Sequence, residues 1–236
     1  PQVAAGGGVG YASSYRAGEW YGDLVAYSVD TSTGLQTGSL LWGLRANIDA
    51  TPFASRKIVS FNGTKPGLAF TATNFAALET ATGMVDFLRG DTSKEGDLAP
   101  AFRNRTSVLG DIINAEPVVV YYSDGTPIIF QGANDGMLHV IDGRTDVSAA
   151  TRGQELWAYV PRLLHGSITA LAAQGYSHRY YVDATPAVAE VSGVSGVSRL
   201  LVGGLGKGGR GFYALNVSSY AAATVADAAS KVMWEF

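Results

Sequence analysis

The 236-residue sequence predicts an all-β protein built from repeated four-stranded sheets, and three observations support this fold class. A strand, a turn, a second strand and a tryptophan follow one another in the same order three times along the chain. Its 30 glycines supply tight reversals, and its 12 tyrosines suit the space between sheets. The 47% hydrophobic and 16% charged residues indicate a substantial folded core. Because repetition at this scale is typical of propellers, we expect one domain forming part of a modified β-propeller, with about three to four blades.

The clearest repeat covers residues 128–161. Its central turn is Asn134-Asp135-Gly136, a tight-turn signal because glycine adopts positive φ freely and Asn or Asp tolerates it better than most residues. We therefore interpret these three residues as a structural turn and not as a ligand site. Runs of β-branched and aromatic residues predict strands at 114–120, 128–131, 137–141 and 156–160.

A second copy of this pattern closes the chain, and the later half of it opens the chain. In the second copy a glycine-rich turn with Gly204, Gly206 and Gly208 replaces Asn-Asp-Gly. This turn fits the dinucleotide pattern G-x-G-x-x-G, but an alternating apolar run follows where a helix should receive the phosphates. We therefore expect a wide hairpin loop. Strands are predicted at 183–189, 199–204, 212–217 and 232–236 in this copy, at 22–30 and 40–42 in the first, and at 56–61 between repeats.

One tryptophan falls at the same place in each repeat: Trp42, Trp157 and Trp234. Large aromatic side chains dominate the energetics of cores and interfaces. We expect the three to be structural anchors that pack one blade against the next. Truncating any one of them should cost roughly 3–5 kcal/mol, as buried large-to-small changes do.

Two segments depart from the repeat pattern. Residues 1–18 are small, glycine-rich and without period, which predicts an entering loop or an edge strand. Apolar residues recur at near-helical spacing within 74–89, predicting one or two short helices divided near Gly83 and stopped by Gly90. These helices belong to a helical and loop insertion over 74–105 that interrupts the succession of strands.

Charge and composition exclude several classes of function. The net charge of −3 gives no indication of a nucleic-acid or anionic-membrane partner. The absence of cysteine removes disulfides, thiolate metal sites and cysteine nucleophiles. No apolar run approaches the roughly 20 residues that span a bilayer, so we expect no membrane insertion. Pro1 begins no secretory n-region or h-region. Either the mature chain is cytoplasmic or a signal lies outside the given piece, and the missing initiator Met favours the second.

The inventory for catalysis is small, and we expect no catalytic residue and no enzyme. The sequence has no G-x-S-x-G elbow, and its histidines are His139, His165 and His178. His139 alternates with apolar residues on an expected strand, while the other two flank the connection between repeats. Core or surface roles explain all three histidines better than acid–base chemistry does.

Arg89-Gly90-Asp91 spells the tripeptide that integrins recognise, and it is a candidate receptor-binding site. The same residues also have a structural explanation, because they follow an expected helix. Gly90 can end that helix and Asp91 can cap the segment that follows.

Six segments follow one another in a fixed order from residue 87 onward. They are Phe-Leu-Arg-Gly-Asp at 87–91, Phe-Arg-Asn-Arg at 102–105, Leu-Gly-Asp-Ile-Ile-Asn-Ala-Glu-Pro-Val at 109–118, Gly-Ala-Asn-Asp-Gly-Met-Leu-His at 132–139, Glu-Leu-Trp-Ala-Tyr-Val-Pro at 155–161 and Tyr-Val-Asp-Ala-Thr-Pro at 181–186. Together these segments resemble the PilY/PilC family, the tip-associated proteins of bacterial type IV pili. The resemblance covers about residues 60–236, and so many segments in one order are far more specific than a short motif. It implies a modified β-propeller at the C-terminal end of a large secreted protein that acts in pilus biogenesis, extension and retraction, and adhesion.

The resemblance also implies partners, a location and a metal. The implied partners are minor pilins of the pilus tip complex and a host or abiotic surface, and the implied location is secreted, at the cell surface or pilus tip. Family members bind calcium in an Asp-rich loop that would come after Phe236, so we expect calcium elsewhere in the full-length protein. Within this chain Asp142-Gly-Arg-Thr-Asp146 offers only two carboxylates with an arginine between them, so we place no metal or cofactor here.

Two other classes of protein are built from similar repeats. Quinoprotein dehydrogenases build propellers from similar blades, but their cofactor sits in a complete ring beside a disulfide of adjacent cysteines, and this chain has no cysteine. A scaffold propeller of outer-membrane assembly machinery would explain the repeats but not the segments at 87–91 and 109–114. We therefore expect a non-catalytic part of a pilus tip complex, with the quinoprotein and the scaffold as alternatives.

Overall fold

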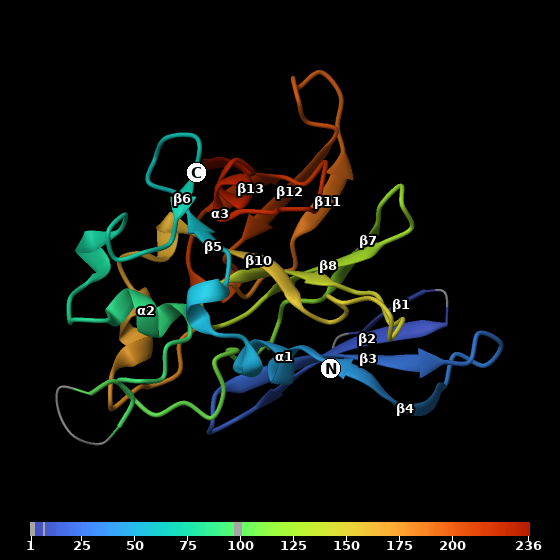
Figure 1. The fold of residues 1–236 in the computed structure, drawn as a ribbon, viewed down its shortest axis with the longest axis horizontal. Helices are drawn as coiled ribbons and strands as arrows, with labels where there is room; N and C mark the ends of the chain where they lie inside the picture. The colour runs from blue at the N-terminus through green and yellow to red at the C-terminus, as the bar shows by residue number, and fades with distance from the viewer. Residues whose placement is uncertain (1–2, 7, 97–100) are drawn as a thin grey trace.

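Three sheets follow one another along the chain in the computed structural model, which describes residues 3–6, 8–96 and 101–236. Figure 1 shows them in chain order, from blue at the bottom through yellow-green to red at the top. The ring that a propeller forms is not closed by these three sheets. The all-β, partial-propeller prediction is confirmed.

The first sheet is an antiparallel meander in which every strand pairs with the next along the chain. Sequence patterns predicted only its later half, with a loop or edge strand over 1–18. The structure corrects this, because that segment supplies both an edge strand and a second, inner strand. The strands are β1 (Val3–Gly6), β2 (Val9–Arg16), β3 (Tyr21–Val29) and β4 (Gln36–Gly43).

The second sheet contains a four-stranded antiparallel meander with two further strands on its outer edge. One edge strand, β5, pairs parallel to the last strand of the meander. The other edge strand, β6, pairs antiparallel to β5. The strands predicted at 56–61, 128–131, 137–141 and 156–160 are confirmed with small shifts in their ends, and the strand predicted at 114–120 begins only at Val118, after Pro117. The meander is β7 (Val118–Tyr121), β8 (Pro127–Gly132), β9 (Leu138–Asp142) and β10 (Glu155–Val160), and the edge strands are β5 (Ile58–Ser60) and β6 (Leu68–Ala69).

The third sheet is again a four-stranded antiparallel meander, as the repeat predicted. The glycine-rich turn joins its second and third strands, so the hairpin interpretation of that turn is confirmed. The strands are β11 (Ala187–Glu190), β12 (Arg199–Gly204), β13 (Phe212–Asn216) and β14 (Val232–Glu235).

Short helices occupy the connections. Two of them lie within 74–89, divided at Gly83 and ended by Gly90, whose positive φ is typical of the residue that ends a helix. None of the helices in the described ranges is long and apolar enough to cross a membrane. The helices are α1 (Leu44–Ala50), α2 (Met84–Arg89) and α3 (Val225–Ala229), with 3₁₀ turns η1 (Phe53–Ser55), η2 (Ala76–Leu78), η3 (Arg162–Leu164), η4 (Ile168–Ala172) and η5 (Gly206–Gly208).

The core consists of two clusters, one on each face of the second sheet. Ile129 and Ile141 face the first sheet, and Phe130 and Val140 face the third. This alternation follows from the two-residue period of a strand. The second sheet is therefore buried on both faces and lies between the first and third sheets.

Candidate functional site

Tryptophan side chains connect each sheet to the next one through the same hydrogen bond. The Trp42 indole N–H of β4 donates to the carbonyl oxygen of Arg144 at 3.0 Å, and the Trp157 indole of β10 donates to that of Tyr220 at 3.0 Å. Each acceptor lies in the loop that follows the third strand of the neighbouring meander. Both indoles are buried, so their N–H groups need such partners.

Tyrosine hydroxyls also donate to backbone carbonyls of these same loops. Tyr11 donates to the carbonyl oxygen of Gly143 at 2.7 Å, and Tyr122 donates to that of Val217 at 2.6 Å. Each acceptor is the residue directly after the third strand of the next meander. Two neighbouring interfaces are therefore built by one rule, with a Trp and a Tyr of one blade bound to the same loop of the following blade.

Trp234 occupies the equivalent place in β14, and none of the three sheets that the structure describes packs over it. Its strand partner is Ala214, as Trp42 pairs with Ala26 and Trp157 with Val140. The side chain is 39% exposed. Among the residues that the structure describes, its indole N–H has no hydrogen-bond acceptor. Two of the three predicted anchors thus lie between blades, and the third lies on an open outer face.

A buried charge network stabilises the second sheet beneath its central turn. Glu155 binds Arg56 through two hydrogen bonds of 2.9 and 2.8 Å, and its Oε2 lies 2.6 Å from Nδ1 of His139. Nε2 of the same imidazole lies 3.1 Å from Asp135. Burial disfavours the imidazolium, but Asp135 and Glu155 outweigh it and raise the pKa of His139 to about 9. Burial opposes ionisation of Glu155 too, yet Arg56 and His139 hold its pKa well below its usual value.

The central turn itself is tied into its surroundings, which agrees with the structural interpretation. Asn134 donates to Asp111 at 2.9 Å and accepts from the backbone N–H of Tyr181 at 2.9 Å. Asp135 accepts from the backbone N–H of Met137 at 3.0 Å, closing the turn. Gly136 has a φ of 91°, where only glycine is unstrained.

The glycine-rich turn contacts backbone from the preceding connection. A Cβ placed on Gly208 would lie 1.8 Å from the carbonyl oxygen of Tyr181, a clash no side chain can avoid. Gly206 has a φ of 59° and also lies against the backbone of Asp183. The close approach of two chain segments explains why glycine recurs here, with no need for a phosphate.

The remaining two histidines have ordinary partners as well. Nε2 of His165 lies 2.9 Å from Oγ of Ser60, but that hydroxyl donates its proton to the carbonyl oxygen of Val160 at 2.7 Å. Burial lowers the pKa of His165 to about 4. Nε2 of His178 lies 2.8 Å from Asp111. These contacts hold the loops that carry the two histidines in place.

The Arg89-Gly90-Asp91 tripeptide lies at the end of α2 with its side chains already engaged. Arg89 donates to the carbonyl oxygen of Phe53 at 3.2 Å, and its side chain is 13% exposed. Asp91 accepts from the backbone N–H and the hydroxyl of Ser93, at 2.9 and 2.8 Å. A receptor would have to displace these contacts in order to bind the tripeptide in the extended form that presents both charges.

The two aspartates at 142 and 146 do not fit calcium. Asp142 accepts hydrogen bonds from the Arg144 guanidinium and from the hydroxyl of Thr151, so a cation already occupies the place of the metal. Asp146 accepts from the backbone N–H of Ser148 at 2.8 Å. In the described ranges no three His, Asp or Glu side chains converge as a metal site would require.

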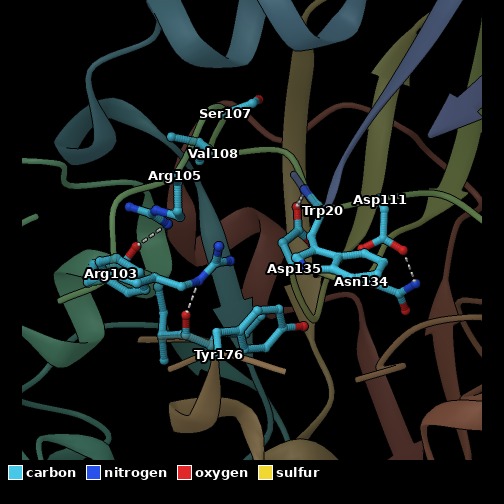
Figure 2. Close-up of a pocket in the computed structure, with 13 residues that line it drawn as sticks. Trp20, Arg103, Arg105, Ser107, Val108, Asp111, Asn134, Asp135 and Tyr176 are labelled. Carbon is cyan, nitrogen blue, oxygen red and sulfur yellow. Dashed lines mark hydrogen bonds between the residues drawn. The ribbon is translucent and has the colours of Figure 1, made fainter. Parts of the chain in front are cut away.

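A small pocket of about 20 Å³ opens between the first sheet and the insertion, and sequence reasoning missed it. Trp20, Arg103, Asp111 and Tyr176 lie around it (Figure 2). Trp20 has a φ of 56°, and its indole lies 4.5 Å from the imidazole of His178 between ring centroids. A bulky residue with positive φ has no signature in a sequence. The position of the Trp20 side chain, and with it this pocket, could therefore not be predicted from the sequence.

Comparison with known proteins agrees with this architecture. Residues 120–236 match the family described as the PilY1 beta-propeller domain. A type IV pilus biogenesis factor PilY1 homolog of Xylella fastidiosa is 33% identical over 240 residues, covering 90% of this chain and 18% of that protein. The type IV pilus biogenesis factor PilY1 of Pseudomonas aeruginosa strain PAK is 31% identical over 272 residues, covering 95% of this chain and 22% of its own length.

The chain thus spans about a fifth of the length of the curated relatives it matches. No solved structure matches it significantly. The resemblance found in the sequence is confirmed both by the family match and by the relatives. The chain belongs to the PilY1 family, and it forms part of the β-propeller domain of that family.

Proposed function

We propose that this chain is the propeller part of a type IV pilus biogenesis factor and that it acts without catalysis. The observation that carries the proposal is the similarity to proteins named type IV pilus biogenesis factor PilY1 over 90–95% of the chain. The neighbouring blades support it, because interfaces built by repeated hydrogen bonds make a rigid body suited to presenting surfaces. None of the relatives above is named as a quinoprotein dehydrogenase or an outer-membrane assembly scaffold.

The proposal includes a position and partners. The protein acts at the cell surface or pilus tip after secretion, contacts minor pilins, and takes part in extension, retraction and attachment to a host or abiotic surface. Calcium bound outside this chain supports those steps in the full-length protein. The engaged side chains of the integrin-type tripeptide favour attachment through other surfaces.

Complementation of a strain that lacks the parent gene tests the proposal. Wild-type protein should restore surface pili, counted by electron microscopy, and twitching on agar. A matched pair of variants then separates the propeller from the rest of the protein. Trp157→Ala should fail because it opens a blade interface, whereas Tyr121→Ala, which removes a half-exposed ring from a hairpin, should restore pili. Normal pili in the deletion strain would refute the proposed function.

A further inference from the structure

A hollow of about 370 Å³ lies outside the small pocket and is open to solvent. It adjoins the pocket, since Trp20, Arg103 and Tyr176 line both. Three separate segments build it: the β2–β3 hairpin, residues 103–106 and the connection between the second and third sheets. The volume lies within the range of about 300–1,000 Å³ typical of small-molecule sites.

Trp20 is held in this hollow by a strained backbone. It is the only non-glycine residue with positive φ in the described part of the chain. It occupies the last position of the hairpin loop, where its backbone N–H donates to the carbonyl oxygen of Arg16. Glycine or asparagine adopts this conformation at little cost, while a bulky residue costs about 1–3 kcal/mol. Strain of this kind persists at sites where the side chain is needed, so the indole requires an explanation beyond packing.

Buried polar groups hold the indole in place from beneath. His178 lies against the ring and is itself fixed by the buried Asp111, which also accepts from Asn134. The half-buried indole thus lies on a support that reaches into the second sheet. An aromatic platform fixed in this way loses little entropy when a ligand binds.

Tyr176 forms a second fixed ring on the other side of the hollow. The Arg103 guanidinium lies 4.4 Å from the centre of this ring, and its Nε donates to the carbonyl oxygen of Leu171 (Figure 2). The phenol oxygen accepts from the backbone N–H of Arg179 at 3.1 Å. Arg103 lines the hollow, and within the described residues no carboxylate lies within 4 Å of its guanidinium.

The rest of the lining is polar and carries both donors and acceptors. Glu19 supplies a carboxylate and Thr106 a hydroxyl, whereas the Gln174 amide already donates to backbone carbonyls beside the hollow. A proline-rich peptide would need a continuous apolar groove, which two rings among polar groups do not provide. Acceptors such as Glu19 disfavour phosphates. Planar rings combined with paired donors and acceptors suit a ligand that has an apolar face and many hydroxyls.

We infer that this hollow is a binding site for a neutral saccharide, with Trp20 as its stacking platform and Arg103 with Glu19 as groups for adjacent hydroxyls. The site goes beyond pilus biogenesis, because binding to an isolated sugar does not depend on pilus assembly. It would give the propeller a direct contact with glycan-coated surfaces.

Immobilised full-length protein provides the test, with polyacrylamide conjugates of glucose, galactose, mannose and N-acetylglucosamine as probes. At least one conjugate should bind. Trp20→Gly should weaken that binding by about tenfold or more, the equivalent of about 1.4 kcal/mol. Trp20→Tyr, which keeps a ring, should retain most of it, and Tyr121→Ala should leave it unchanged.

The melting temperature separates a binding role from a structural one. Glycine relieves the backbone strain at position 20, so Trp20→Gly should melt at the wild-type temperature or above it. The inference is overturned if no conjugate binds, if Trp20→Gly binds as wild type does, or if a proline-rich decapeptide binds in place of the sugars. A large fall in melting temperature on Trp20→Gly would also overturn it, since the ring would then be a packing residue.

Discussion

At the scale of single residues, the tryptophans show how one side chain can have different importance in equivalent positions. Trp157 is fully buried and hydrogen-bonded between two sheets, while Trp234 in the same place on the last sheet is partly exposed. We therefore expect the three tryptophans to contribute unequally to the free energy of unfolding. A residue's contribution depends on whether the neighbouring blade is there to cover it.

Truncation should reveal that difference. In the 236-residue chain we predict that Trp157→Ala lowers the free energy of unfolding by roughly 3–5 kcal/mol, because a large buried ring and its hydrogen bond are lost. Trp234→Ala should cost distinctly less. Urea denaturation measures both, and equal losses would mean that Trp234 is covered by something other than a following blade.

His139 should make stability depend on pH. Its folded pKa of about 9 lies above its ordinary value of 6.5, so its contribution is full below pH 6.5 and is lost as the pH rises through 9. The free energy of unfolding should fall over this window by up to about 1.4 kcal/mol per pH unit. His139→Gln should flatten the decline between pH 6.5 and 9. A decline that persists in this variant would assign it to other groups.

At the scale of elements, most strands and the short helices within 74–89 were predictable, whereas contacts between distant segments were not. Alternating apolar residues and turn glycines located the strands from β7 to β14, because both signals are local. Residues 3–6 and 9–16 lack that alternation, and they form strands by pairing in order onto β3: β2 pairs with β3, and β1 pairs with β2. The buried network of Arg56, His139 and Glu155 likewise joins residues far apart in the sequence, which no spacing rule could bring together.

The β12–β13 hairpin gives a test of close backbone approach. Gly208→Ala should destabilise the protein by about 1–3 kcal/mol, since a Cβ there meets the backbone of Tyr181 and neither segment can move freely. Gly166→Ala is the matched control, with nothing within 4 Å of the added carbon. Thermal unfolding of the two variants should differ clearly. Equal melting temperatures would show that the loop relaxes without cost.

The end of α2 gives a test of the integrin-type tripeptide. Asp91→Glu should leave cell attachment unchanged, because the Asp91 carboxylate accepts from the backbone N–H of Ser93 and the Arg89 guanidinium donates to the carbonyl oxygen of Phe53. Attachment of cells to surfaces coated with the full-length protein is the measurement. A marked loss of attachment with unaltered melting temperature would establish the tripeptide as a receptor site.

At the scale of the whole molecule, three blades form an open arc whose last face is apolar. Phe212, Trp234 and Phe236 of the third sheet are exposed, although two neighbouring interfaces cover the equivalent surfaces with the loop of a following blade. Exposed apolar faces of this kind are typical of interaction surfaces. In the full-length protein we expect a further blade to cover this one, and its loop carbonyl to accept the Trp234 N–H.

Hydroxyl-radical footprinting of the tryptophans tests this propeller account most directly. Trp42 and Trp157 should be protected both in the 236-residue chain and in the full-length protein. Trp234 should oxidise readily in the short chain and become as protected as Trp157 in the full-length protein. Rapid oxidation of Trp234 in the full-length protein would contradict the account, since no blade would then follow the third sheet.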